Sequence, residues 1–167
     1  MNGEPTPGDT APPGTASTDA TQSLRVDFYV IEDGGGHARL TLACKLAEKA
    51  YLAQQSVLVW HTDPQELRSF DDMLWTFRDG SFVPHEALAP DALAPIQLTA
   101  GAAPQAPVDL IINLAADVPP CIAQSAPPIT KRVIEIIDGD EGRRRAGRAR
   151  FKAYRDLGVT PASHNVA

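Results

Sequence analysis

Short apolar runs alternate along this chain with segments whose apolar residues recur at helical spacing, and this alternation limits the possible folds. The runs are typical of buried parallel strands and lie at 25–31, 56–60, 108–114 and 132–137, with a shorter one at 96–99. The helical segments span 37–54, 63 to about 75, and 140 or 141 to 158. The alternation predicts an α/β fold, with a single domain whose mostly parallel, open sheet carries helices on both faces.

Local signals set the boundaries of this domain. Asp63, Pro64 and Glu66 suit the N-cap, first and third positions of a helix. Residues 1–22 hold four Pro, three Gly and five Thr but no large apolar residue after the initiator Met, so we predict a disordered tail. The folded domain is expected over 23–160, followed by a flexible C-terminus at 161–167.

Composition narrows the class of protein. The chain has 167 residues, 43% of them hydrophobic, which is enough for one domain with a proper core. No apolar stretch approaches the roughly 20 residues of a membrane span, and no secretion signal precedes the first strand. Cys44 and Cys121 lie in unrelated contexts without clustered His, which argues against a disulfide or zinc site. We therefore expect a cytoplasmic protein with no membrane contact.

No catalytic, cofactor-binding or metal-ligating set of residues emerges. The glycine run after the first strand begins a G-x-G-x-x-G pattern at Gly34, but the third glycine is replaced by Arg39, and no phosphate-binding P-loop occurs. The four histidines fall in or beside separate connections, and neither a nucleophile elbow nor a paired-carboxylate signature is present. The glycine run is interpreted as a turn, and we predict no catalysis by this chain.

Charge is distributed unevenly. Residues 1–130 contain 6 Lys+Arg and 16 Asp+Glu, whereas residues 142–155 contain seven basic residues and no acidic one. On a helical wheel one face of this segment is basic and carries Arg144, Arg148, Phe151, Lys152 and Arg155. The opposite face is small and apolar and is expected to pack on the sheet; it carries Ala146, Ala149, Ala153 and Leu157.

Three interpretations of this basic face are open. An acidic peptide that ends in a hydrophobic residue and a free carboxylate would use both the cations and Phe151. Alternatively, Phe151 packs under a neighbouring loop and the arginines form a solvated surface. The third interpretation is a direct single-stranded nucleic-acid surface, which the acidic remainder of the chain disfavours.

Four stretches resemble one known family. They are FYVIED near the start, Leu74-Trp75, SFVPH at 81–85 and R-x-R-F-K-A-Y-R at 148–155. In this order, over roughly residues 25–160, the chain resembles the chi subunit of bacterial DNA polymerase III holoenzyme. The resemblance implies a nucleotide-binding-like fold without a phosphate loop, no cofactor, and a non-catalytic place in a DNA-directed DNA polymerase complex.

The resemblance also implies partners and their residues. The acidic C-terminal tail of single-stranded DNA-binding protein would bind the basic helix, with Arg144 and Arg148 taking its carboxylates. The other residues implied for this pocket are Phe151, Lys152 and Arg155, with Trp75 and Ile137 as apolar walls.

A psi subunit would bind as a 1:1 heterodimer and link the chain indirectly to the clamp loader. The residues implied for psi are Phe82, Val83, Pro84 and His85.

The long Ala/Pro-rich region at 86–107 departs from the family pattern, so a helicase-like partner on the psi surface stays open. The expected function is that of a replisome tether whose DNA contact is weak or indirect. The alternatives are a direct single-stranded nucleic-acid binder, which predicts steep salt dependence for bare oligonucleotide, and a degenerate nucleotide-binding enzyme, which predicts ATP or NAD binding.

Overall fold

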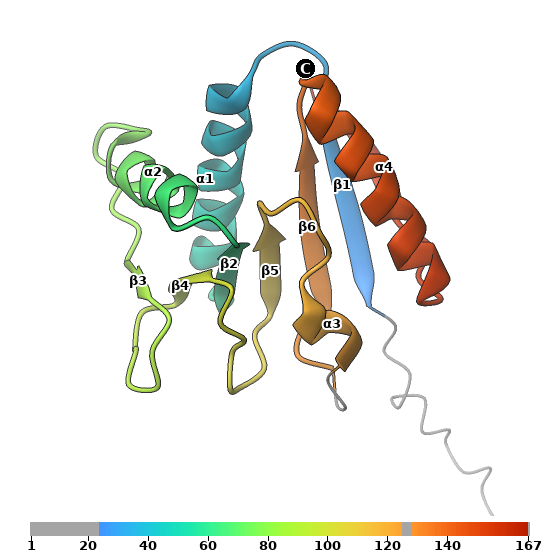
Figure 1. The fold of residues 1–167 in the computed structure, drawn as a ribbon. Coiled ribbons are helices and arrows are strands. Elements are labelled where there is room, and N and C mark those ends of the chain that lie inside the picture. The colour runs from blue at the N-terminus through green and yellow to red at the C-terminus, as the bar shows by residue number, and fades with distance from the viewer. Residues whose placement is uncertain (1–23, 125–127, 167) are drawn as a thin grey trace, which may run out of the picture.

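The computed structural model describes residues 24–124 and 128–166, and within them a parallel sheet of seven strands runs through the molecule (Figure 1). Its strands follow the order β3-β4-β2-β5-β6-β1-β7. They are β1 (Arg25–Ile31), β2 (Val57–His61), β3 (His85–Ala87), β4 (Ile96–Ala100), β5 (Leu110–Asn113), β6 (Arg132–Ile137) and β7 (Ala162–Val166). The helices are α1 (Gly36–Leu52), α2 (Pro64–Thr76), α3 (Pro120–Gln124) and α4 (Glu141–Asp156).

The predicted open α/β fold is confirmed, and all neighbouring strands are parallel. Three short elements were not predicted: β3, α3 and β7. The expected tail at 1–22 lies outside the described residues. None of the helices in the described part of the chain is long and apolar enough to cross a membrane.

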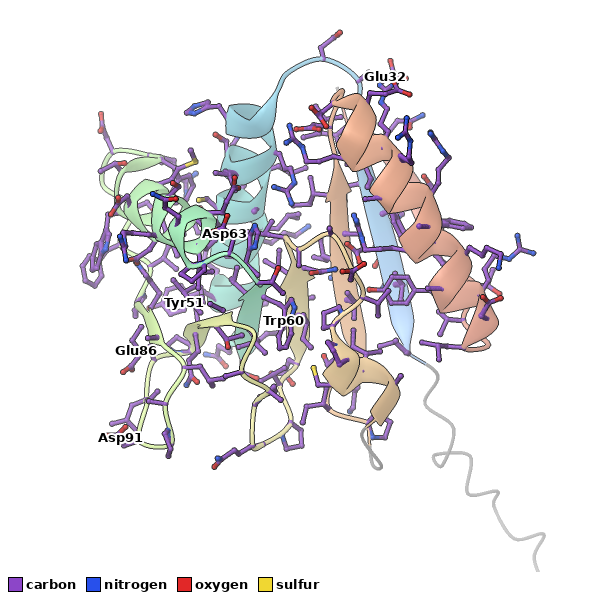
Figure 2. All side chains as sticks on the ribbon, viewed as in Figure 1. Glu32, Tyr51, Trp60, Asp63, Glu86 and Asp91 are labelled. Atoms are coloured by element: carbon purple, nitrogen blue, oxygen red, sulfur yellow. The ribbon has the colours of Figure 1, made fainter. Side chains whose placement is uncertain are left out.

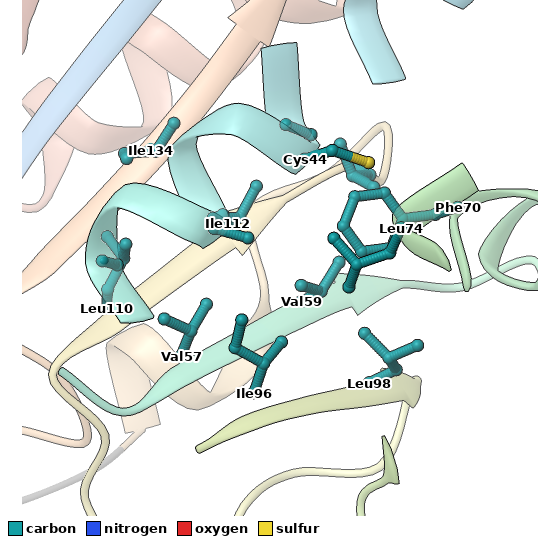
Figure 3. Packing of buried hydrophobic residues seen from close by; sticks show 14 of the residues in the cluster. Cys44, Val57, Val59, Phe70, Leu74, Ile96, Leu98, Leu110, Ile112 and Ile134 are labelled. Atoms are coloured by element: carbon teal, nitrogen blue, oxygen red, sulfur yellow. The ribbon is translucent and has the colours of Figure 1, made fainter. Parts of the chain in front are cut away.

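Each face of the sheet carries its own core because successive strand residues point to opposite sides. In β2, Val57 and Val59 pack in the cluster covered by α1 and α2, part of which Figure 3 shows. Leu58 and Trp60 pack in the second cluster, which α3 and α4 cover. The helices thus lie on both faces, α1 and α2 on one and α3 and α4 on the other.

The helix starts follow the local signals. Asp63 caps α2 by accepting a hydrogen bond from the Gln65 amide at 2.9 Å, as predicted. The glycine run before α1 forms a turn in which Gly34 has a φ of +116°, a conformation that side chains rarely adopt. A Cβ atom at Gly34 would also lie 2.7 Å from the Cβ of Ala38, so the turn requires glycine there.

The expectation of a flexible C-terminus at 161–167 is wrong for β7, which pairs with β1 along its length. A buried carboxylate explains the attachment. Asp27 Oδ1 lies 2.9 Å from His164 Nε2 of β7, and Asp27 Oδ2 accepts a hydrogen bond at 2.9 Å from Arg132 Nε of β6. One side chain of β1 therefore connects both neighbouring strands, an arrangement that local sequence patterns do not reveal.

The Asp27→Asn variant is predicted to be less stable and less sensitive to acid. Burial opposes ionisation of Asp27, but hydrogen bonds from His164 and Arg132 outweigh it and lower its pKa from the ordinary value of 3.8. The resulting stabilisation is complete above that ordinary value and is lost as the pH falls through the lower pKa of the folded state. Losing these charge-assisted bonds should cost about 1–3 kcal/mol at neutral pH.

Urea unfolding of both proteins at a series of pH values measures this dependence. Below about pH 4 the free energy of unfolding of the wild type should fall more steeply than that of Asp27→Asn. Parallel curves for the two proteins would contradict a link between Asp27 ionisation and folding.

Candidate protein-binding surfaces

Helix α4 carries the basic segment, and each of its ends has a residue that favours a helix boundary. Asp140 caps the N-terminus by accepting a hydrogen bond from the Arg143 amide at 2.8 Å, and Glu141 lies in the first turn. Arg155 lies in the last turn, before Gly158 with a φ of +87°. Acidic residues at the start and basic residues at the end both interact favourably with the helix dipole. The helix that the sequence predicted from residue 140 or 141 to 158 is thus confirmed.

The face of α4 that meets the sheet differs from the predicted one. Its buried residues are Gly147, Arg150 and Tyr154, whereas Ala149 and Leu157 of the predicted apolar face are exposed. A helical wheel assigns an arginine to solvent unless a buried partner is known. Here Arg150 has its partner on β6, so the face of α4 that carries Arg150 is buried, and the prediction that an alanine-rich face packs on the sheet is wrong.

That partner is Glu135, which is fully buried in the centre of β6. Its carboxylate accepts hydrogen bonds from Arg150 Nε at 3.0 Å, the Tyr154 hydroxyl at 2.7 Å and Asn113 Nδ2 at 2.9 Å. Burial raises the pKa of Glu135, and Arg150 opposes that shift. Burial raises the pKa of Tyr154, and the negative charge of Glu135 raises it further. The hydroxyl of Tyr154 therefore keeps its proton and donates it to Glu135 in a hydrogen bond. The network fixes the rotation of α4 on the sheet.

This rotation determines which basic side chains face solvent. Arg148, Lys152 and Arg155 are exposed and Arg144 is half-buried; together with Phe151 these four residues are named the α4 basic surface. Lys152 Nζ lies 3.4 Å from Asp156, a pair that solvent weakens, and Arg144 Nε donates to the Asp138 carbonyl at 3.3 Å. Within the described residues, Arg148 and Arg155 form no ion pair, so both are available to an anionic partner.

Phe151 is partly buried rather than fully outward-facing. Its ring packs against Phe28 of β1, with 5.3 Å between the ring centroids, and belongs to the second core cluster. Ile137 is also buried, directly under Gly147, where a Cβ atom would lie 2.3 Å from the Ile137 Cδ1 atom. The structure thus brings Phe151 beside the basic residues but places Ile137 beneath the helix.

Trp75 is not part of the α4 basic surface, contrary to the expectation. It belongs to α2, which packs with α1 on the opposite face of the sheet, and Figure 1 shows α2 and α4 at opposite ends of the sheet. The spacing within α2 could have indicated this orientation. Phe70 and Leu74 mark the buried side, and Trp75 follows Leu74 with a turn of about 100° toward solvent.

Trp75 instead forms a second candidate surface with the predicted SFVPH stretch. Its ring lies 5.7 Å from that of Phe82 and 4.5 Å from that of His85, between centroids. Phe82 is 69% exposed and Trp75 is 49% exposed, and these two residues are named the aromatic surface. Large apolar side chains that remain this accessible are typical of protein-binding sites. The exposure of Phe82 shows that its side chain is not part of the hydrophobic core.

The other residues of this stretch support the aromatic surface from below. Val83 is buried in the first core cluster, and Pro84 is half-buried. His85 is enclosed, with Nδ1 at 2.7 Å from the Val83 carbonyl and Nε2 at 2.7 Å from Asp71 Oδ1. Of the four residues predicted for partner binding, Phe82 therefore offers the main contact area, and the others position it.

A polar contact holds the loop that carries Phe82. Glu48 of α1 accepts hydrogen bonds from the Ser81 hydroxyl and from Arg78. The hydrogen bond from Ser81 is the largest cause of a pKa of Glu48 below its ordinary value. The hydrogen bond from Arg78 lowers this pKa further, whereas burial opposes the shift. The carboxylate is therefore ionised near neutral pH and ties the loop to α1.

Comparison with known proteins identifies relatives of this chain. Residues 24–162 match the family described as DNA polymerase III chi subunit, HolC. The chain is also similar to a protein of Pseudomonas aeruginosa named DNA polymerase III subunit chi. The two are 37% identical over 142 residues, which are 85% of this chain and 96% of the relative.

Proposed function

The chain belongs to the family of DNA polymerase III chi subunits, and from this premise we propose that it tethers the polymerase to single-stranded DNA-binding protein. As a member of this family it is a component of the DNA polymerase III complex with an accessory role in replication. In the proposal it contributes no catalytic residue of its own. Its α4 basic surface binds the acidic C-terminal tail of single-stranded DNA-binding protein, and its aromatic surface binds a second protein.

The observation that carries the tail-binding proposal is a pair of exposed arginines on α4, at residues 148 and 155, beside the partly buried ring of Phe151. Neither arginine forms an ion pair with any residue that the structure describes. Guanidinium groups form bidentate hydrogen bonds with carboxylates, so these arginines and Arg144 suit the acidic residues and the free C-terminus of the tail. The exposed edge of Phe151 suits a hydrophobic terminal side chain, because an aromatic ring offers a large, rigid contact area.

A peptide titration tests this proposal. A fluorescent Asp-Asp-Asp-Ile-Pro-Phe peptide with a free C-terminus is expected to bind with micromolar affinity. Arg148→Ala should weaken binding roughly 10- to 100-fold, because charge-assisted hydrogen bonds are lost. Phe151→Ala, and separately the removal of the terminal Phe from the peptide, should weaken binding at least as much, because the apolar contact is lost. Arg68→Ala removes an exposed arginine from α2 and serves as the control that keeps full affinity.

The competing function is direct binding of single-stranded DNA by the same arginines. It predicts salt-sensitive affinity for a bare oligonucleotide and weak or absent binding of the peptide. That combination, lost in Arg148→Ala, would contradict tail binding and favour the nucleic-acid interpretation.

The aromatic surface is proposed to bind a psi subunit in a 1:1 complex, which would join the chain to the clamp loader, or a helicase-like protein in its place. Its support is the exposure of Phe82 and Trp75, because exposed aromatic side chains account for much of the binding energy at protein interfaces. This surface and the α4 basic surface lie on opposite faces of the sheet, so both partners can bind at once. Several tails on one oligomer would raise the overall affinity by effective concentration.

A further inference from the structure

A cavity of about 330 Å³ lies at the carboxyl ends of β2 and β5, between α1 and α4. Asp63, which Figure 2 labels at the start of α2, belongs to its lining. β2 continues into α2 on one face of the sheet, whereas β5 continues into α3 on the other. Where neighbouring strands diverge in this way, open α/β proteins have a crevice that commonly binds ligands. The volume is within the range of small-molecule sites.

Arg39 of α1 is a buried cation in the wall of this cavity. It is only 6% exposed, and its Nη2 atom donates to the Leu114 carbonyl at 2.5 Å. Its Nε atom is buried and has no hydrogen-bond acceptor among the described residues, and the guanidinium forms no ion pair with a described carboxylate. Buried charges in proteins are normally paired, so an unpaired guanidinium in a cavity wall indicates an anionic ligand.

The two other arginines of the lining have partners. Arg143 makes a bidentate contact with Asp138, at 2.9 Å from Nε and 2.7 Å from Nη2. Arg150 pairs with Glu135 beneath α4. Within the described lining, Arg39 is therefore the arginine that forms no ion pair. Asp138 and Glu66 attract its charge only from beyond ion-pair distance.

His61 supplies a second donor at the end of β2. Its Nδ1 atom accepts hydrogen bonds from the amides of Thr62 at 2.8 Å and Asp63 at 3.0 Å, so Nε2 carries the proton of the neutral ring. Burial and then Arg39 lower the pKa of His61, which keeps the ring neutral near pH 7. Nε2 lies 3.8 Å from Glu66 Oε2, too far for a hydrogen bond, and is free to donate to a ligand.

The acidic residues of the lining do not oppose an anion equally. The carboxylates of Asp63 and Asp140 cap α2 and α4 and accept hydrogen bonds from backbone amides of those helices. Glu66 is 54% exposed at the rim, where solvent screens its charge. The remaining wall includes the small residues Gly142 and Ala146, which leave room for a compact group beside Arg39.

We propose that this cavity binds a compact oxyanion, the phosphate or carboxylate group of a small molecule, between the Arg39 guanidinium and the His61 Nε2–H group. The site is separate from the α4 basic surface and from the aromatic surface. The site lies where nucleotide-binding α/β folds bind their ligands, at the carboxyl ends of the strands, but it has no phosphate loop. The proposal of this site does not depend on the proposed tether function.

Thermal unfolding of the full chain in inorganic phosphate, in sodium acetate and in sodium chloride at equal ionic strength tests the proposal. Phosphate or acetate is expected to raise Tm with a saturable dependence on concentration, whereas chloride does not. The more effective of the two anions identifies the oxyanion class. If neither anion exceeds chloride, the proposal is overturned.

Variants locate the effect. Arg39→Met should weaken the anion dependence at least about 10-fold, because the charged donor is lost. Arg145→Met removes an exposed arginine of α4 that is not assigned to either surface, and it should leave the dependence unchanged. Glu66→Gln should strengthen anion binding several-fold by removing the negative charge at the rim, and it remains informative if Arg39→Met does not fold.

Two outcomes of the variant series contradict the proposal. If the anion effect disappears in Arg148→Met but persists in Arg39→Met, the anion binds on the α4 basic surface instead. If Glu66→Gln leaves the apparent affinity unchanged and the His61 imidazole resonances do not shift on titration with phosphate, the cavity is not the binding site.

Discussion

Replacing Glu135 by alanine is expected to lower the free energy of unfolding by about 3–5 kcal/mol. The carboxylate is fully buried and is the common acceptor for Arg150, Tyr154 and Asn113. Without this carboxylate, the guanidinium of Arg150, the hydroxyl of Tyr154 and the amide of Asn113 each lose a hydrogen-bond acceptor between α4 and the sheet. Removing one partner of a buried ion pair costs more than the pair itself contributes, because the remaining charge is uncompensated.

Urea denaturation measures this loss, and two further variants separate its causes. Arg145→Ala, at an exposed position of the same helix, should change stability by less than about 0.5 kcal/mol. The double variant Glu135→Leu/Arg150→Met should recover much of the loss, because apolar groups of similar volume can replace a buried ion pair. A loss below about 1 kcal/mol for Glu135→Ala would contradict the structural importance of the network.

The same series connects stability to function. The network fixes the rotation of α4, and this rotation brings Arg148 and Arg155 to solvent. The affinity of folded Glu135→Leu/Arg150→Met for the acidic peptide can be compared with that of the wild type. Equal affinities would show that apolar packing alone holds the α4 basic surface in place.

Replacing Phe82 by alanine should weaken binding of the second partner protein roughly 30- to 1,000-fold, the range found for central aromatic residues of interfaces. Stability should hardly change, because the side chain is 69% exposed. Isothermal titration with psi, or with a helicase-like partner, measures the affinity, and urea denaturation checks the fold. Trp75→Ala should have an effect in the same direction, since its ring packs against Phe82.

Leu93→Ala is the matched control, because Leu93 is 92% exposed on a different loop. It should leave the affinity for the partner unchanged. Equal losses for Leu93→Ala and Phe82→Ala would show that apolar exposure alone, rather than the aromatic surface, explains the binding. If neither Phe82→Ala nor Trp75→Ala weakens binding of either partner, the proposed second surface is wrong.

Local sequence patterns were sufficient for most of the fold. The apolar runs predicted the longer strands and their parallel arrangement, and Asp63 marked the start of α2. The short elements β3 and α3 were missed because they have three and five residues, too few to establish a periodicity. The family motifs were also readable, since they are contiguous stretches such as SFVPH and the basic segment of α4.

The candidate surfaces were only partly predictable. The sequence indicated that Arg148 and Phe151 lie close together, because residues three or four positions apart in a helix are neighbours. It misplaced Trp75, which shares no local pattern with α4 and lies on the other face of the sheet. The cavity at Arg39 was not recognised, because the glycine motif that would have drawn attention to it is incomplete.

By itself, then, the sequence determined the α/β class, the main helices and strands, and the family, because these depend on periodicity and motifs within short stretches. Only the tertiary structure decided which face of α4 is buried, where Trp75 lies and that the C-terminal residues form β7. Each of these depends on a partner that is distant in the sequence. Glu135 turns Arg150 inward from 15 residues away, and Asp27 holds His164 from 137 residues away. Buried charges are stabilised by whichever partner the fold brings near, and local patterns do not encode that partner.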